Sequence, residues 1–140
     1  MRFSVKSEYA VTAVLDVAGH ADKGPVHVRS IASRQAIPLK FLEQVMASLK
    51  KAGIVDSIRG SQGGYVLARG PKTINIAQIV EAIEGPIAPV DCITDTAEYR
   101  YLQMNGCVVR DVWDDVKRAI SKVLNGVTIE DLDRKKREKE

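Results

Sequence analysis

Residues 60–69 read Gly60-Ser-Gln-Gly-Gly-Tyr-Val-Leu-Ala-Arg69, a glycine-rich turn that runs into a β-type segment. The apolar run Ile54-Val-Asp-Ser-Ile58 precedes them, and a basic helical pattern comes before that run. Because glycine adopts positive φ at little steric cost, Gly63-Gly64 is expected to turn the chain between two strands. The order helix, turn, helix, strand, glycine loop, strand is typical of a winged helix-turn-helix, so the pattern predicts nucleic-acid binding.

The first helix is expected over residues 4–20, where Val5, Tyr9 and further apolar residues recur at helical spacing. Ser4 is a plausible N-cap because its hydroxyl can accept a hydrogen bond from a free backbone N–H. Val26-His-Val28 is a candidate strand that would pair with the wing. A second short helix is expected from Arg29 to Gln35.

The third helix is expected over residues 38–52 and corresponds to the recognition helix. Pro38 fits its first helical position, where no backbone N–H is needed. Gly53 is expected to end the helix as a left-handed cap. The expected apolar stripe comprises Phe41, Leu42, Val45, Met46 and Leu49.

The start of a recognition helix faces the base edges in the major groove. Gln44 can pair with adenine, and Glu43 can accept a hydrogen bond from cytosine. Arg59 at the wing tip suits a narrow minor groove. The predicted DNA-binding residues are Arg29, Pro38, Leu39, Lys40, Glu43, Gln44, Lys50, Arg59, Gly60, Gln62 and Gly63, with Lys51 as a further phosphate contact. For any one of them, the alternative is an ordinary polar surface residue.

The second half of the chain contains two further helical patterns, at residues 73–83 and from Val109 to Leu124. The second is long and strongly amphipathic, so its apolar face needs a partner. Thr128 is a plausible cap for a last short helix, and residues 134–140 are expected to form a solvated charged end. The fold class predicted is mostly α with a small β wing. The expected parts are a winged helix-turn-helix domain at 1–84, a connector and sensor loop at 85–107, and a dimerisation helix with a charged tail at 108–140.

Charge is distributed unevenly along the 140 residues, although the net charge is only +3. Residues 1–72 carry eleven basic and five acidic side chains, whereas residues 73–140 carry ten and thirteen. This asymmetry favours a DNA-facing half joined to a half that faces elsewhere, with chance as the alternative. No secretory signal or membrane-spanning run is evident, so a cytoplasmic protein without membrane contact is expected.

The stretch Gly60–Arg69 resembles the wing signature of the Rrf-two family of bacterial regulators, which includes IscR, NsrR and RsrR. Two further stretches are similar to that family. Its first helix resembles Met1-Arg-Phe-Ser-Val-Lys-Ser-Glu-Tyr-Ala10, and the start of its recognition helix resembles Ile37-Pro-Leu-Lys-Phe-Leu-Glu-Gln44. The resemblance implies a homodimeric repressor or activator that binds a palindromic operator in double-stranded DNA. It also implies that the long C-terminal helix pairs with its symmetry mate, and that Glu43 and Arg59 face the grooves.

Cys92 and Cys107 are the only cysteines, with fourteen residues between them. The resemblance implies cluster ligands here, but the middle cysteine of the family's usual three is absent, which argues against a three-cysteine [4Fe–4S] site. A [2Fe–2S] cluster needs four protein ligands, so two cysteines of one chain leave two positions open. The resemblance implies Glu8 as a candidate ligand that the other chain of a dimer would contribute. A solvated helix carboxylate is the alternative for Glu8.

Three interpretations of the cysteine pair stay open: a [2Fe–2S] cluster, a thiol redox pair, or cysteines without a sensing role. The leading function is a redox-responsive or iron–sulfur-responsive homodimeric regulator. The alternatives are a regulator that senses through thiols or a small molecule, and an architectural module that binds DNA without sequence preference. An enzyme is not expected, because no nucleophile–base pair or phosphate-binding glycine fingerprint is evident.

Overall fold

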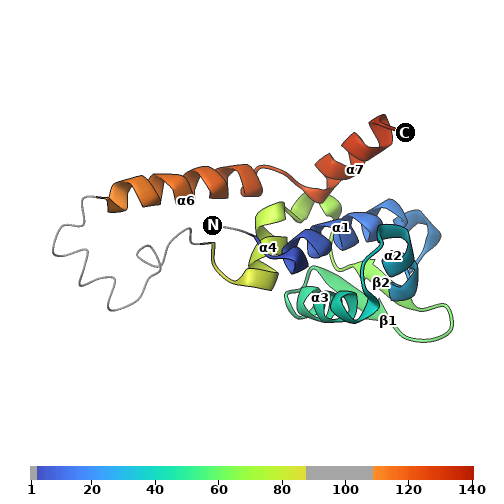
Figure 1. Ribbon diagram of the computed structural model, residues 1–140. Coiled ribbons are helices and arrows are strands. Elements are labelled where there is room, and N and C mark those ends of the chain that lie inside the picture. The colour runs from blue at the N-terminus through green and yellow to red at the C-terminus, as the bar shows by residue number, and fades with distance from the viewer. Residues whose placement is uncertain (1–2, 88–108) are drawn as a thin grey trace.

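The computed structural model describes residues 3–87 and 109–140. The first half of the chain contains α1 (Val5–Gly19), η1 (Ala21–Lys23), α2 (Val28–Gln35), α3 (Leu39–Lys51), β1 (Val55–Ile58) and β2 (Gly64–Leu67). It continues through η2 (Pro71–Thr73) and α4 (Ile76–Glu84). After the segment that is not described come α6 (Arg110–Asn125) and α7 (Ile129–Glu138), which Figure 1 shows in orange and red. The predicted class, mostly helical with a two-stranded wing, is confirmed.

The helices begin where the sequence offers caps. The Ser4 hydroxyl accepts a hydrogen bond from the Ser7 N–H at 3.2 Å and starts α1, as predicted. Asn75 and Gln78 cap α4 reciprocally, with both bonds at 2.9 Å. Thr128 and Asp131 form the same arrangement at α7. Each pair satisfies backbone N–H groups that the first turn of a helix otherwise leaves unpaired.

One apolar core holds the winged helix-turn-helix together. Side chains of α1, α2, α3, β1 and α4 meet in it, and the fully buried ones include Val14, Ile31, Leu42, Leu49 and Ile79. The expected stripe of α1 was wrong in part, because Val5 is 56 % exposed. The buried face of that helix consists instead of Ser7, Ala10, Ala13, Val14, Asp16 and Val17.

The last helix, α7, packs back against the first half of the chain. Ile129 is fully buried in the main core, and Leu132 packs against it. Backbone hydrogen bonds from Ile129 N to Ile74 O (2.9 Å) and from Ile76 N to Val127 O (3.0 Å) tie the α6–α7 turn to the start of α4. Residues 134–138, expected to be a simple charged end, therefore belong to a helix whose first turn is part of the core. The boundaries at 84 and 107 stay a prediction, because the segment between them is largely outside the described residues.

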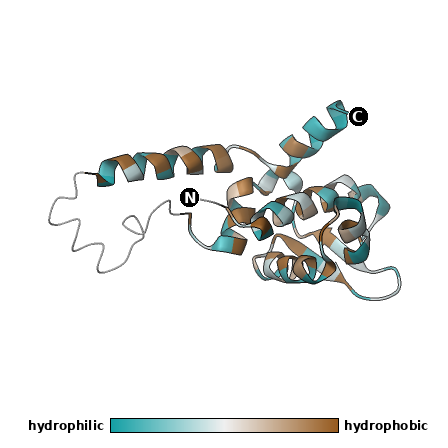
Figure 2. Ribbon diagram, in the orientation of Figure 1, coloured by the Kyte–Doolittle hydropathy of each residue, from teal (hydrophilic) through white to brown (hydrophobic). Residues whose placement is uncertain are grey.

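The helix α6 has its apolar side largely in solvent. Ile120 and Leu124 pack against Ala77, Val80 and Ile87 around α4, but no residue of α6 is fully buried. Figure 2 shows apolar residues along α6, which extends away from the main body. None of the helices in the described ranges combines the length and apolar character needed to cross a lipid bilayer.

Candidate DNA-binding surface

The orientation of α3 follows from its buried face. Leu42, Val45, Met46 and Leu49 lie in the core, each at most 1 % exposed. Because these residues recur every three or four positions, the opposite face of the helix must point outward. Lys40, Glu43, Gln44 and Lys50 are exposed accordingly, and Leu39 is half-buried.

Two expectations for α3 were wrong. Pro38 is the N-cap, with φ −57° and ψ 128°, and the helix begins one residue later at Leu39. Phe41, expected in the core stripe, is 47 % exposed. It lies one position before Leu42, at the edge of the buried face and on the side nearest the start of α1.

The wing is an antiparallel hairpin in which Val55 pairs with Leu67 and Ile58 with Gly64. Its tip residues Arg59, Gly60 and Gln62 are exposed. Figure 1 shows the loop between the strands projecting from the body at the edge away from α6. A hairpin that projects in this way leaves its tip free to contact another molecule.

The glycine geometry of the wing differs from the expectation. Positive φ occurs at Gly60 (110°) and Gly64 (151°), and not at Gly63. Gly63 is needed for a close approach instead, because a Cβ there would lie 2.1 Å from the Ile58 carbonyl oxygen. The motif therefore uses glycine for two different physical reasons, and the sequence alone did not separate them.

The wing is attached to the start of α2. Val26 and Tyr65 form a β-bridge with N–O distances of 2.8 and 2.7 Å. The strand expected over residues 26–28 is thus reduced to this single bridge, because Val28 already begins α2. His27 caps α2, its Nδ1 accepting a hydrogen bond from the Arg29 N–H at 3.3 Å, and the Arg29 side chain is exposed.

The other end of α3 also contacts the wing. The Lys50 Nζ donates to the Ser57 Oγ at 2.6 Å, which joins the last turn of α3 to β1. The start of α2, the wing and α3 are therefore connected by direct contacts. Each of these three connected elements carries an exposed cation: Arg29 on α2, Lys50 on α3 and Arg59 at the wing tip.

Beneath this surface, a buried carboxylate fixes α1 against α2. The Asp16 side chain is fully buried and accepts hydrogen bonds from Arg34 Nε (3.0 Å), Arg34 NH2 (2.6 Å) and Gln35 Nε2 (2.8 Å). Burial alone would raise the pKa of Asp16. The hydrogen bonds from Arg34 and Gln35, with the charges of Arg34 and His20, outweigh it and hold the pKa below its usual value.

Sequence reasoning missed Lys6 in this region. Its Nζ donates to the Gln44 Oε1 at 2.9 Å and lies 5.8 Å from the centroid of the Phe41 ring. Nothing in the spacing of α1 signals this contact, because the partners lie more than thirty positions away on α3. Only the packing of α1 on α3 brings them together.

The predicted sensor residues fall largely outside the described chain. Cys92 and Cys107 both lie outside it. Glu8 is exposed in the first turn of α1. Within residues 3–87 and 109–140, no group of three or more His, Cys, Asp or Glu side chains could hold a metal ion. Both histidines have other contacts, since His20 Nδ1 lies 2.8 Å from the Asp16 carbonyl oxygen and His27 caps α2.

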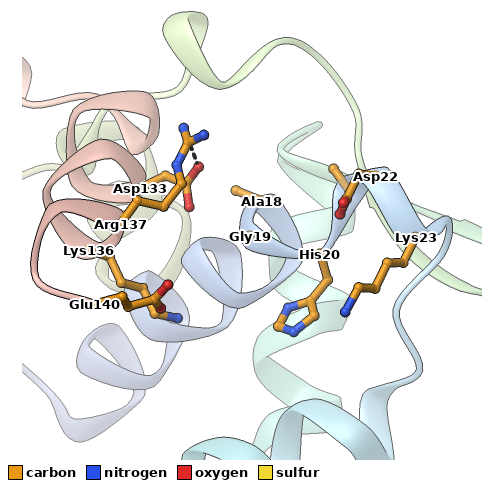
Figure 3. A pocket seen from close by; sticks show the side chains of 10 residues that line it. Ala18, Gly19, His20, Asp22, Lys23, Asp133, Lys136, Arg137 and Glu140 are labelled. Carbon is orange, nitrogen blue, oxygen red and sulfur yellow. Dashed lines mark ion pairs between the residues drawn. The ribbon is translucent and has the colours of Figure 1, made fainter.

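A polar hollow of about 610 Å³ lies between the end of α1 and the end of α7 (Figure 3). Its lining includes Lys23, Asp133, Lys136 and Glu140. Asp133 forms an ion pair with Arg137 at 3.0 Å. Acidic and basic side chains are balanced around it, so the charge of the hollow selects neither an anion nor a cation. It is separate from the wing and α3.

This geometry defines a class: a winged helix-turn-helix protein whose recognition helix and wing tip are exposed and basic. The comparison with family models agrees, because residues 3–135 match Rrf2, described as an iron-dependent transcriptional regulator. The chain is 35 % identical to the transcriptional regulator CymR of Bacillus subtilis over 94 % of its own length and 89 % of that protein. It is 36 % identical to the regulator IscR of Yersinia pestis, covering 94 % and 79 % of the two chains.

Solved structures agree as well. The structure of T. potens IscR matches with a TM-score of 0.75 and 39 % identity, covering 94 % of this chain and 85 % of that one. The structure of B. subtilis CymR, called the global cysteine regulator, matches with a TM-score of 0.79 and 34 % identity, covering 96 % and 97 %. The chain belongs to the Rrf2 family, the Rrf-two family expected from its wing. Its members are DNA-binding transcriptional regulators and not enzymes.

Proposed function

We propose that this regulator acts as a homodimer that binds a palindromic operator through α3 and the wing. The observation that carries the proposal is the uncovered apolar face of α6. The helix α3 and the wing, which would contact DNA, are exposed in the other half of the chain. A two-fold symmetric dimer presents two recognition helices, which fit half-sites about one helical turn apart. Arg29, Lys40, Lys50 and Arg59 supply the phosphate and groove contacts, and Glu43 and Gln44 face the bases.

The exposed side of α6 has the composition of an interface between two copies. Val112, Trp113, Val116 and Val123 are between 36 and 64 % exposed. A shallow apolar hollow beside them is lined by Phe3, Ala119, Ile120, Val123 and Leu124. Apolar side chains at this spacing along one helix are the pattern by which helices pair, and a contiguous exposed apolar patch marks an interaction surface.

A charge introduced into this face tests the dimer. Val116→Glu would place a carboxylate in the interface, so we expect the mass in sedimentation equilibrium to fall from two chains to one. Losing the linkage between half-sites lowers operator affinity by about 10²-fold or more. Lys122→Glu, on the charged side of the same helix opposite this apolar face, is the matched control and leaves the mass and the operator affinity unchanged. A Val116→Glu protein that remains dimeric contradicts the proposal.

For the signal, we propose that Cys92 and Cys107 form the sensing site, with a [2Fe–2S] cluster as the leading cofactor. Two observations support it: the description of the family as iron-dependent, and the position of Cys107 three residues before α6 begins. When bound, a cluster would supply redox or ligand-exchange chemistry at that site. The chain's own contribution is to connect the cysteines to the helix that sets the separation of the two recognition helices.

The cluster has a direct test. Protein prepared without oxygen should show visible absorption, with iron and sulfide bound per chain, and Cys92→Ala/Cys107→Ala should lack both. Glu8→Ala should alter the spectrum if Glu8 completes the ligand set, whereas Glu130→Ala should not. Equal operator affinity of the native and the double-alanine protein would show that the cysteines do not control DNA binding.

A thiol sensor is the second candidate, favoured by one comparison: the oxidised form of Staphylococcus aureus CymR is 26 % identical to this chain with a TM-score of 0.67. A colourless, iron-free protein whose operator affinity changes when Cys92 and Cys107 are oxidised would favour this candidate. Cysteines without a sensing role would leave operator affinity unchanged in both experiments. An architectural role would appear as a ratio of specific to non-specific affinity close to one at fixed salt.

A further inference from the structure

An aromatic ring lies exposed on the recognition helix beside a lysine from another helix. Phe41 is 47 % exposed although it is a large apolar side chain. The Lys6 Nζ lies 5.8 Å from its centroid and donates a hydrogen bond to the Gln44 Oε1 at 2.9 Å. We call Lys6, Phe41 and Gln44 together the Lys6 patch.

The patch lies on the part of α3 that reaches the bases in a helix-turn-helix. Phe41 and Gln44 are three positions apart, so they are neighbours on the helix surface. Both belong to the first two turns of α3, and both are exposed, while Leu42 and Val45 face the core. Lys6 itself is exposed in the first turn of α1 and is held beside them by the packing of α1 on α3.

The contact with Lys6 changes what Gln44 offers to a base. A free glutamine pairs with adenine by donating from Nε2 to N7 and accepting at Oε1 from the adenine amino group. Here Oε1 already accepts from an ammonium, whose positive charge opposes the approach of a second N–H donor. The groups left to face a base are donors: the Nε2 amide hydrogens and the remaining ammonium hydrogens.

Two neighbouring donors match guanine, which presents the acceptors O6 and N7 in the major groove. The Phe41 ring adds an apolar surface one helical turn away. An apolar side chain in the major groove contacts the C5 methyl group of thymine, the one apolar group among the base edges there. The three side chains therefore match guanine and thymine in adjacent positions.

We propose that Lys6, Phe41 and Gln44 act as one base-reading unit that recognises guanine beside thymine. The inference rests on operator binding through α3, as proposed above, and changes the expectation that Gln44 reads adenine. It assigns to α1 a direct part in sequence recognition.

The test starts by selecting duplexes from a random pool with the full-length wild-type protein and with Lys6→Met, followed by sequencing. Methionine keeps an unbranched side chain only one atom shorter and removes the charge and the donor. We expect wild type to enrich guanine at one position of each half-site, and Lys6→Met to shift that position to adenine. The change in the guanine-to-adenine affinity ratio should be about tenfold.

The matched control is Lys40→Met, which removes an exposed lysine from the same helix. As a phosphate contact, Lys40 should affect all duplexes alike and lower the salt slope of binding by about one per protomer. If Lys6→Met behaves like this control, with an unchanged consensus, Lys6 is only a phosphate contact and the inference is overturned. A wild-type protein that enriches no sequence overturns operator recognition as well.

A second measurement needs no variant of Lys6. Replacing the thymine beside the selected guanine by uracil removes only the methyl group. We expect wild-type affinity to fall about threefold, as the loss of one buried methyl contact implies. Phe41→Ala should bind the thymine and uracil duplexes equally. A wild-type protein that does not distinguish them overturns the role of Phe41.

Discussion

Asp16 joins α1 to α2 through its side-chain hydrogen bonds. Its carboxylate is fully buried on α1 and accepts three hydrogen bonds from Arg34 and Gln35 on α2. A buried charge is tolerated only when it is paired and hydrogen-bonded in this way. Because α2 carries Arg29 and supports the wing, Asp16 links the core to the proposed DNA surface without contacting DNA.

We expect Asp16→Asn to lower the free energy of unfolding by about 2 to 3 kcal/mol, less than for a wholly buried pair because Arg34 reaches solvent. Urea denaturation at pH 7 measures this. Asp115→Asn, whose carboxylate is 77 % exposed on α6, is the control and should change stability by less than about 0.5 kcal/mol.

The difference in unfolding free energy between wild type and Asp16→Asn should also depend on pH. The pKa of Asp16 is lower in the folded protein than its unfolded value of about 3.9. The stability that the carboxylate contributes is therefore present above the unfolded pKa and lost as the pH falls through the folded pKa. The difference between wild type and Asp16→Asn should be full at pH 7 and shrink below about pH 4. A difference that grows on acidification contradicts this account.

At the scale of the element, the wing depends on how closely its second strand approaches the start of α2. A Cβ on Gly64 would lie 2.6 Å from the Val26 carbonyl carbon and oxygen and 2.9 Å from the His27 nitrogen. Gly60, at the other side of the turn, also has positive φ but no atom within 4 Å of its Cβ position. A substitution at Gly60 therefore meets backbone strain alone, whereas one at Gly64 meets both backbone strain and a steric clash.

Gly64→Ala must displace β2 from the Val26 bridge, so we expect a loss of about 2 to 3 kcal/mol in unfolding free energy and weaker operator binding. Gly60→Ala meets only backbone strain and should cost about 1 to 2 kcal/mol. Urea denaturation and fluorescence anisotropy with an operator duplex measure the two effects. Equal costs would mean that the approach of β2 to Val26 does not determine the wing's position.

At the scale of the molecule, charge is separated along the chain. Residues 1–72 carry a net charge of +6, and the exposed cations Arg29, Lys40, Lys50, Lys51 and Arg59 lie on α2, α3 and the wing. Phosphate contacts of this kind displace counterions, so affinity falls as salt rises. Six to ten such contacts in a dimer would correspond to a loss of about 10³ to 10⁵ in affinity between about 50 and 200 mM salt.

In the proposed dimer, Arg59→Ala removes one cation from each of two wings, so the slope of log affinity against log salt should become shallower by about two. Anisotropy titrations over a series of salt concentrations measure the slope. Arg134→Ala, on α7 and ion-paired with Asp131 at 3.1 Å, is the control and should leave it unchanged. An unaltered slope in Arg59→Ala would place the wing tip away from the phosphates.

Local chemistry in the sequence determined the elements of this protein. Ser4 and Thr128 could be identified as caps because capping depends on neighbouring residues, and the order of helices and strands identified the winged helix-turn-helix. The exposure of Phe41, its contact with Lys6 and the insertion of Ile129 into the core were decided only by tertiary structure. Each depends on which segments, distant in the chain, pack together. Periodicity along a single helix shows that one face will be covered, but it does not show which segment covers it.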